Sequence, residues 1–154
     1  RGGIYHIHAT GSYEKDRFPQ QLTAAGVDPK APGLDIRTYI DDMPDCLAAA
    51  DLVISRAGAM TLSELEASGT ACVLIPSPNV AENHQYHNAR VLEERGAAVV
   101  IEEKNLSPEL LRSTVAGLCE EPQTLCRLGK NAQKMAVLDA NERIYREIIS
   151  LIGT

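Results

Sequence analysis

Short apolar runs alternate along the chain with longer segments of helical periodicity. The runs predict five strands, at residues 3–10, 35–40, 51–55, 71–76 and 97–102. The last three are nearly continuous in Val, Ile, Leu and Ala, which is typical of strands buried on both faces of a parallel sheet covered by helices. The sequence therefore predicts an α/β fold built on a parallel sheet.

Helical patterns fill the stretches between and after these runs. They predict helices at residues 14–25, 43–50, 60–68, 83–95, 107–120, 122–138 and 142–152. Gly69 and Gly96 suit helix ends, and Ser107 followed by Pro108 suits a helix start. We expect the amphipathic last helix to pack on the chain's own core. No repeat or linker interrupts the pattern, so residues 1–154 are predicted to form a single domain.

Composition narrows the classes of function. The chain has 154 residues, a net charge of −6 and 4% aromatic residues. An acidic chain with few aromatics is a poor match to nucleic acid, which is bound by clustered Lys and Arg and by stacking side chains. No apolar run is long enough to cross a membrane. The four cysteines form no C-x-x-C pair, so we expect reduced thiols and a cytoplasmic protein.

Metal and covalent chemistry find little support. His84 and His87 are three residues apart, and His6 and His8 alternate along a predicted strand. Neither pair has a further ligand at a convincing spacing, so we expect no metal and no cofactor. The sequence also lacks a Walker loop, a G-x-G-x-x-G turn and a G-x-S-x-G elbow.

The first candidate site lies at residues 55–69, after the third predicted strand. Thr61 and Glu64 fit a capping box, in which both side chains bond backbone N–H groups at a helix start. The turn through Gly58 and Ala59 equally fits a diphosphate at a helix N-terminus, with Glu64 placed to accept hydrogen bonds from ribose hydroxyls. The two interpretations compete for Glu64, and the local pattern leaves both open.

The second candidate site lies at residues 76–89, after the fourth predicted strand. Ligands of open parallel sheets bind beyond the carboxyl ends of the strands, and amide and imidazole groups there suit sugar hydroxyls. Helix capping is the structural alternative. The polar residues concerned are Asn79, Glu82, Asn83, His84, Gln85 and Asn88.

Two motifs make the chain resemble a known family. They are Arg56-x-Gly58-Ala59-x-Thr61-x-x-Glu64 and Gln85-x-x-Asn88-Ala89. With the sequence around them they resemble the C-terminal domain of the MurG family, and the resemblance extends from Ile4 to about Ile152. Members transfer N-acetylglucosamine from UDP to lipid I, forming lipid II for peptidoglycan. The resemblance implies a Rossmann-like domain, the C-terminal half of a GT-B glycosyltransferase, that binds UDP-N-acetylglucosamine.

The resemblance also implies roles for particular residues. Ile40 corresponds to the residue whose backbone contacts uracil, with Tyr39 and Met43 beside it. The start of the helix after the third predicted strand corresponds to the family's diphosphate-binding position, and Glu64 corresponds to the residue that binds the ribose hydroxyls. His84 and Gln85 occupy donor-sugar positions, where the family more familiarly has two glutamines, and Arg56 either faces the site or supports its loop. The full set is Tyr39, Ile40, Met43, Arg56, Gly58, Ala59, Met60, Thr61, Glu64, His84, Gln85 and Asn88.

The chain differs from the family pattern near its start. The first strand of the family's C-terminal domain, its G-G-S-x-G-A turn and the acceptor-binding N-terminal domain are not found in this sequence. We therefore expect the chain to bind donor without catalysing transfer. The general base, lipid I binding and most membrane contact are expected in the N-terminal domain. The whole enzyme is expected in the cytoplasm, peripheral on the inner face of the bacterial plasma membrane.

Three other interpretations stay open at this point. One is a non-catalytic donor-binding subunit of a split UDP-N-acetylglucosamine transferase. Another is a UDP-sugar 2-epimerase domain, although the additional acidic and histidine catalytic residues of that class are not found. The last is an α/β domain without a ligand, in which Thr61 and Glu64 only cap a helix.

Overall fold

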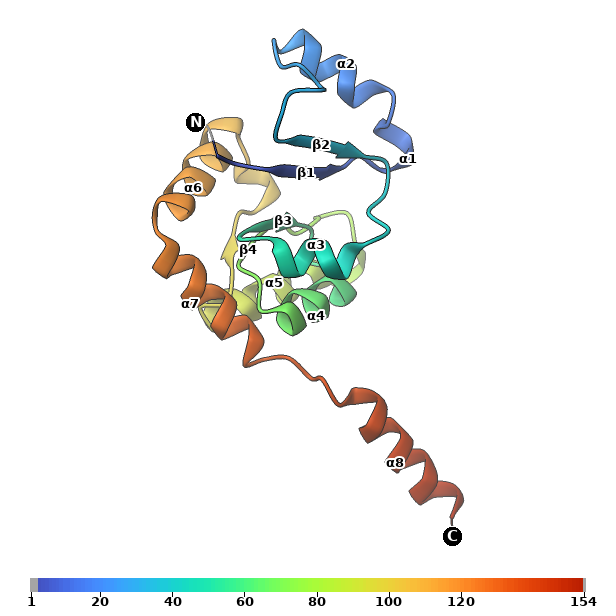
Figure 1. Ribbon diagram of the computed structural model, residues 1–154. Helices are drawn as coiled ribbons and strands as arrows, with labels where there is room; N and C mark the ends of the chain where they lie inside the picture. The colour runs from blue at the N-terminus through green and yellow to red at the C-terminus, as the bar shows by residue number, and fades with distance from the viewer. Residues whose placement is uncertain (1–2, 154) are drawn as a thin grey trace. The chain divides into compact units, whose positions relative to one another are not determined.

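The chain divides into two units, residues 1–46 and residues 47–154, in the computed structural model (Figure 1). The structure describes residues 3–153. Every strand pairing among these residues is parallel, which confirms the predicted α/β class. The strands form a two-stranded sheet in the first unit and a three-stranded sheet in the second.

The first unit is built on two short parallel strands. His6 of the first strand lies opposite Leu34 of the second. The second strand ends at Arg37, so the prediction of a strand through Ile40 was wrong, and Thr38 to Ile40 lie in a loop. The pairing ends there because the first strand offers only four residues, the last at Ala9. The elements are β1 (His6–Ala9), α1 (Gly11–Glu14), α2 (Arg17–Ala24) and β2 (Leu34–Arg37).

His8 on β1 packs against helix α2. Its imidazole stacks on the ring of Phe18, with ring centroids 4.1 Å apart and planes 5° apart. Burial lowers the pKa of His8, and the nearby His6 lowers it further. A buried imidazole loses hydration that its charged form needs, so the folded unit favours the neutral ring.

The lowered pKa of His8 predicts that acid destabilises the protein. Well above pH 6.5 the ring is neutral in both folded and unfolded chains, so it contributes no pH dependence there. As the pH falls below that value, the unfolded chain takes up the proton first, and the free energy of unfolding declines. Urea denaturation at pH 7.5 and 5.5 measures this decline. His8→Gln should reduce the decline, and an equal decline in that variant would contradict the assignment.

The second unit places β4 at the centre of its sheet, between β3 and β5. Val73 of β4 lies opposite Ile54 on one side and Val99 on the other. Helix α3 crosses from the first unit into the second. The elements are α3 (Met43–Ala49), β3 (Val53–Ser55), α4 (Ala59–Ser68), β4 (Cys72–Leu74), η1 (Ala81–Asn83), α5 (His84–Glu94), β5 (Val99–Val100), η2 (Glu103–Asn105), α6 (Pro108–Glu120), α7 (Pro122–Gln133) and α8 (Ala140–Ile152).

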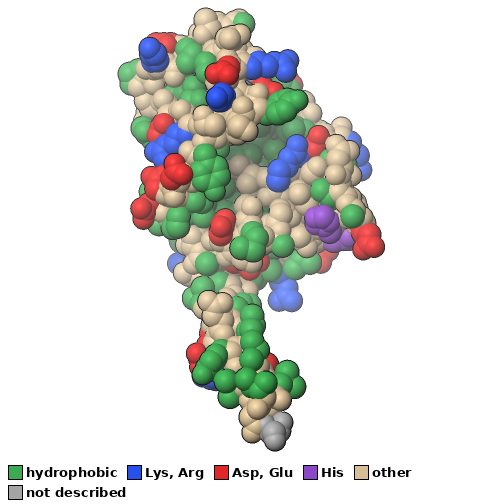
Figure 2. All heavy atoms as spheres, turned by 90° about the vertical axis from the view of Figure 1, so that its right-hand side faces the viewer, with side chains coloured by type: hydrophobic (Ala, Val, Ile, Leu, Met, Phe, Trp, Pro, Cys, Tyr) green, Lys and Arg blue, Asp and Glu red, His purple; other side chains and the backbone are tan. Residues whose placement is uncertain are grey.

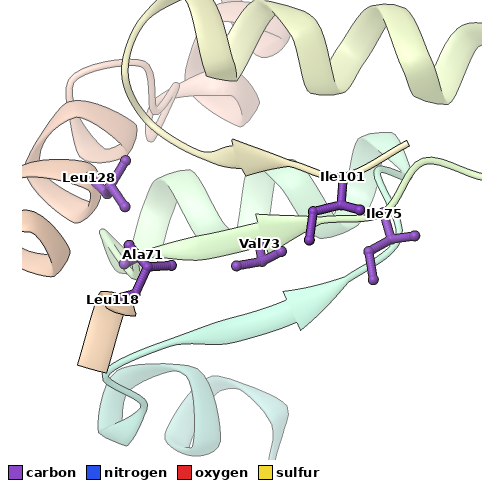
Figure 3. Close-up of a cluster of buried hydrophobic side chains, with 6 residues drawn as sticks. All are labelled: Ala71, Val73, Ile75, Ile101, Leu118 and Leu128. Carbon is purple, nitrogen blue, oxygen red and sulfur yellow. The ribbon is translucent and has the colours of Figure 1, made fainter. Parts of the chain in front are cut away.

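The core of this unit surrounds β4. Figure 3 shows side chains from the β4 segment meeting those of Ile101, Leu118 and Leu128. Burial raises the pKa of the Cys72 thiol to about 12, with a smaller contribution from Glu66. All three residues of β4 are fully buried, as its apolar run predicts. The same prediction was wrong for β3, where Ile54 is exposed between two half-buried residues, and for β5, which is half-buried, because each lies at an edge of this sheet among the described residues.

Helix ends follow local chemistry closely. Helix α4 ends at Gly69, which adopts the left-handed conformation with φ +67°. Ser107 accepts a hydrogen bond of 3.1 Å from the N–H of Leu110, and Pro108 opens helix α6. These ends were predicted from sequence because glycine tolerates positive φ and a serine hydroxyl replaces a missing helical acceptor.

Helix α8 differs from its prediction. It is amphipathic, but none of its residues is buried, so the expectation that it packs on the chain's own core was wrong. Its apolar side chains lie on its surface (Figure 2). Those most exposed are Ile144, Tyr145, Ile148, Ile149, Leu151 and Ile152. None of the helices within residues 3–153 has the length and apolar character needed to cross a membrane.

Candidate functional site

The start of helix α4 offers unbonded backbone N–H groups. Gly58 precedes the helix in an extended conformation, and no side chain caps the helix start. The first helical hydrogen bond runs from the N–H of Leu62 to the carbonyl of Gly58, at 3.0 Å. Within residues 3–153 the N–H groups of 59–61 therefore have no hydrogen-bond acceptor. These groups and the positive end of the helix dipole favour an anion.

The capping-box alternative is wrong. Helix α4 begins at Ala59, so Thr61 is its third residue and cannot serve as its cap. Glu64 is exposed, and its carboxylate has no hydrogen bond or ion pair among the described residues. Since Glu64 lies three residues after Thr61, both occupy neighbouring positions on the same face of the helix. The carboxylate is thus available to a ligand near the helix start.

Arg56 connects the segments that follow the three strands of this sheet. Its Nη1 donates to the carbonyl oxygen of Ile75, after β4, at 3.1 Å. The same nitrogen lies 2.5 Å from a carboxylate oxygen of Glu103, after β5. Both contacts are to protein groups, which favours the supporting role for Arg56. Sequence analysis missed Glu103, although its position directly after the fifth predicted strand could have indicated it.

We expect Arg56→Ala to lower the free energy of unfolding by about 1 kcal/mol, because a backbone carbonyl loses a charged donor and the ion pair is partly exposed. Urea denaturation measures the change. Glu103→Gln should lower stability less, because the carbonyl bond remains. A loss of nucleotide affinity in Arg56→Ala without any loss of stability would contradict the supporting role.

The start of helix α5 is held to the neighbouring loops by amide side chains. Oε1 of Gln85 accepts a hydrogen bond of 2.9 Å from the N–H of Ser77. Nδ2 of Asn88 donates to the carbonyl of Ala57 at 3.4 Å. Both contacts orient loops after β4 and β3. The structure thereby connects residues of the two sequence-predicted sites, and Ser77, which sequence analysis missed, takes part through its backbone.

His84 lies at the exposed first position of α5. Its Nδ1 is 2.9 Å from the carbonyl oxygen of Ala81, which leaves Nε2 available. The two residues before it, Glu82 and Asn83, have positive φ angles of 49° and 53°. Such angles are unfavourable for residues other than glycine and concentrate at functional sites.

The loop after β2 in the first unit carries the other predicted residues. Tyr39 is exposed, and Ile40 and Met43 are half-buried. The loop is fixed at its start by a hydrogen bond of 3.0 Å from the N–H of Gly11 to the carbonyl of Thr38. Among the described residues, neither the N–H nor the carbonyl of Ile40 makes a backbone hydrogen bond. One donor and one acceptor are therefore available at that residue.

Residues 3–153 contain no group of three or more His, Cys, Asp or Glu side chains arranged to hold a metal ion. The groups observed at the start of helix α4 are backbone N–H donors, the positive end of a helix dipole and the carboxylate of Glu64. Parallel strands followed by an uncapped helix start define a Rossmann-like α/β domain suited to a phosphate-containing ligand.

Residues 2–144 match the model of the glycosyltransferase family 28 C-terminal domain. The chain belongs to this family. Its resemblance to the MurG family is confirmed by curated relatives and by a solved structure.

The relatives share one name, UDP-N-acetylglucosamine–N-acetylmuramyl-(pentapeptide) pyrophosphoryl-undecaprenol N-acetylglucosamine transferase. The protein of that name from Acetivibrio thermocellus is 47% identical over 147 residues, which cover 96% of this chain and 38% of the relative. Its counterpart from a Thermoanaerobacter species is 51% identical over 113 residues, covering 73% of this chain and 31% of that protein. The chain thus spans well under half the length of the relatives it matches.

Solved structures agree with this assignment. The crystal structure of Acinetobacter baumannii MurG superposes with a TM-score of 0.79 at 30% identity, covering 94% of this chain and 40% of that one. The glycosyltransferase VinC, solved in complex with dTDP, superposes with a TM-score of 0.62 at 20% identity, covering 82% of this chain and 31% of VinC. The second likeness shows the shared fold alone.

Proposed function

We propose that this chain is the nucleotide-sugar-binding part of the inverting transferase that converts lipid I to lipid II, with UDP-N-acetylglucosamine as its donor. One observation carries the proposal: helix α4 begins without a side-chain cap and carries Glu64, whose carboxylate has no partner among the described residues. N–H groups with no protein acceptor suit a diphosphate, and an unpaired carboxylate suits the two hydroxyls of a ribose. The relatives' names, which include the donor sugar and a lipid-linked acceptor, support the same function.

We assign the parts of the donor to separate segments. In the first unit, the backbone of Ile40 bonds uracil, with Tyr39 and Met43 beside it. In the second unit, the start of α4 binds the diphosphate. Glu64 holds the ribose. On this proposal residues 1–154 serve as one donor-binding domain. The diphosphate group consists of Gly58, Ala59, Met60 and Thr61.

The donor sugar is assigned to the start of helix α5. His84 presents an exposed imidazole there. Gln85 holds the Ser77 loop through Oε1 and keeps its amide nitrogen for a sugar hydroxyl. Asn88 and Arg56 act by orienting the loops rather than by touching the donor.

In the proposed reaction, a hydroxyl of the muramyl sugar attacks the anomeric carbon, the bond to the diphosphate breaks, and configuration inverts. Negative charge grows on the departing UDP, where the N–H groups of 59–61 stabilise it. The general base that accepts the hydroxyl proton, the lipid I site and most membrane contact belong to a further domain of the whole enzyme. That enzyme acts in the cytoplasm at the inner face of the bacterial plasma membrane.

Calorimetric titration of this chain with UDP-N-acetylglucosamine, UDP-glucose and ADP-ribose tests the proposal. We expect selective binding of the uridine donors, with N-acetylglucosamine preferred over glucose. We also expect no transfer to a lipid I analogue by this chain alone. A folded chain that binds none of the three, or binds ADP-ribose equally well, would overturn the proposal. Full transferase activity would show that the general base lies within these residues.

A further inference from the structure

A cluster of charged side chains braces the loop that follows β2. Arg37, the last residue of β2, lies between two carboxylates. Its Nε donates to Asp35 at 2.9 Å and its Nη2 lies 2.8 Å from the same oxygen. Its Nη1 donates to Asp42 at 2.6 Å. Arg37 thus connects the strand before the loop with the residue directly before helix α3.

Further contacts hold Asp35 and Arg37, the strand residues of this charged cluster, in place. The hydroxyl of Tyr5 donates to Asp35 at 3.4 Å, and Nη1 of Arg37 lies 3.7 Å from Sγ of Cys46 in α3. The carbonyl of Arg37 accepts from the N–H of Thr10 at 2.9 Å. The guanidinium holds the pKa of Asp35 below its usual range. All these residues belong to the first unit.

The braced segment, residues 38–41, has few restraints of its own. Within residues 3–153, its backbone is tied to another segment only through the carbonyl of Thr38, which accepts a hydrogen bond from the N–H of Gly11. Tyr39 is exposed, and no backbone hydrogen bond holds Ile40 among the described residues. A loop with so few internal contacts keeps a single shape mainly through what fixes its ends.

We infer that Arg37 is a positioning residue for base selection: by holding Asp35 and Asp42 together, it fixes the backbone of Ile40 in the orientation that selects a uracil base. The inference rests on the proposed function, because it takes Ile40 as the uracil contact. Uracil presents a donor at N3 and an acceptor at O4, which a backbone carbonyl and N–H can match. Cytosine presents the reverse at both positions. Selection between them therefore depends on the orientation of one peptide segment.

The size of the effect follows from the ordering of the loop. Arg37 and Asp35 are half-buried and Asp42 is exposed. Partly exposed ion pairs contribute only modestly to stability, so removing Arg37 should not unfold the unit. If the loop then spends only a tenth of its time in the binding shape, the apparent Kd for a uridine ligand rises about tenfold. A ligand with another base, such as CDP, gains little affinity from that loop shape, so its Kd rises less when the shape is lost. Arg37 should therefore change the ratio of affinities for UDP and CDP.

The experiment compares UDP and CDP binding to the 154-residue chain by calorimetry. Arg37→Ala should weaken UDP about tenfold and CDP less than about twofold, and amides 38–42 should exchange hydrogen faster without ligand. Asp42→Asn, at a half-exposed position, should shift the ratio in the same direction by less. The double variant should be no worse than Arg37→Ala, because the two residues act through one contact. Arg17→Ala, which removes another ion-paired arginine of this unit, an exposed one paired with Glu14, should leave the ratio unchanged.

The UDP-to-CDP affinity ratio of the variants decides whether Arg37 positions the loop for base selection. A tenfold fall in the UDP-to-CDP ratio, with unchanged circular dichroism, supports the inference. If the wild-type chain binds UDP through Glu64 and the Arg37 and Asp42 variants keep the wild-type ratio of UDP to CDP affinity, the role of Arg37 is overturned. The proposed function then stays intact. An equal weakening of UDP and CDP also overturns it, because base selection is then untouched. A folded wild-type chain that binds no UDP overturns the proposed function and this inference together.

Discussion

Replacing Glu64 with alanine is expected to weaken UDP binding by about 100-fold. On our proposal the carboxylate accepts hydrogen bonds from two ribose hydroxyls, and charge-assisted bonds of this kind contribute about 3 kcal/mol together. The substitution should not harm the fold, because Glu64 is exposed and has no partner among the described residues. Calorimetry with UDP, after circular dichroism has confirmed folding, measures the loss.

The control for this prediction is Glu147→Ala. Glu147 is also an exposed glutamate within a helix, α8, so the charge change is the same. It should leave the Kd for UDP within about twofold. Glu64→Gln should fall between wild type and Glu64→Ala, because the amide keeps one acceptor oxygen and loses the charge. UDP binding that is equally strong in wild type and Glu64→Ala would show that the ribose is bound elsewhere.

Gly129→Ala is expected to lower the free energy of unfolding by about 3 kcal/mol, through overpacking. Gly129 lies in α7 where that helix crosses the end of α4. A Cβ atom there would lie 2.1 Å from the carbonyl oxygen of Gly69 and 3.5 Å from the backbone nitrogen of Ala71. Both neighbours are backbone atoms directly before β4, so relieving the clash requires moving the helix or the central strand. Urea denaturation measures the change.

Gly117→Ala is the matched control, because Gly117 also lies inside a helix, α6, and its added Cβ would meet nothing within 4 Å. Alanine is the better helix former by about 1 kcal/mol, so this variant should be slightly more stable than wild type. Equal stabilisation by Gly117→Ala and Gly129→Ala would show that α7 does not approach Gly69 so closely.

The amino-acid sequence determined the class of fold and the ends of several helices. A continuous apolar run is compatible with a buried parallel strand, and β4 is one. Gly69 and Ser107 mark helix ends for reasons that act within a few residues, the tolerance of glycine for positive φ and a hydroxyl that replaces a missing acceptor. The residues proposed for the diphosphate and ribose also came from a local motif.

Pairing and packing decided the features that sequence analysis missed or misplaced. The run at 35–40 is rich in β-forming residues, yet β2 ends at Arg37 because its partner strand ends at Ala9. The run at 51–55 looks fully buried, yet Ile54 of β3 is exposed and its neighbours are half-buried, because the position of β3 at the edge of its sheet depends on which strands pair.

In the candidate site, too, some features follow from local sequence and others only from tertiary contacts. Thr61 and Glu64 have the spacing of a capping box, but the helix begins at Ala59 and has no side-chain cap, so the Glu64 carboxylate is not used in capping. The Arg56–Glu103 contact joins residues 47 positions apart, and no local pattern specifies such a partner. Sequence determined the chemistry available at each strand end, since that depends on neighbouring residues. Only the tertiary structure decided which polar groups have hydrogen-bond partners within the protein and which are available to a ligand, because those partners come from distant parts of the chain.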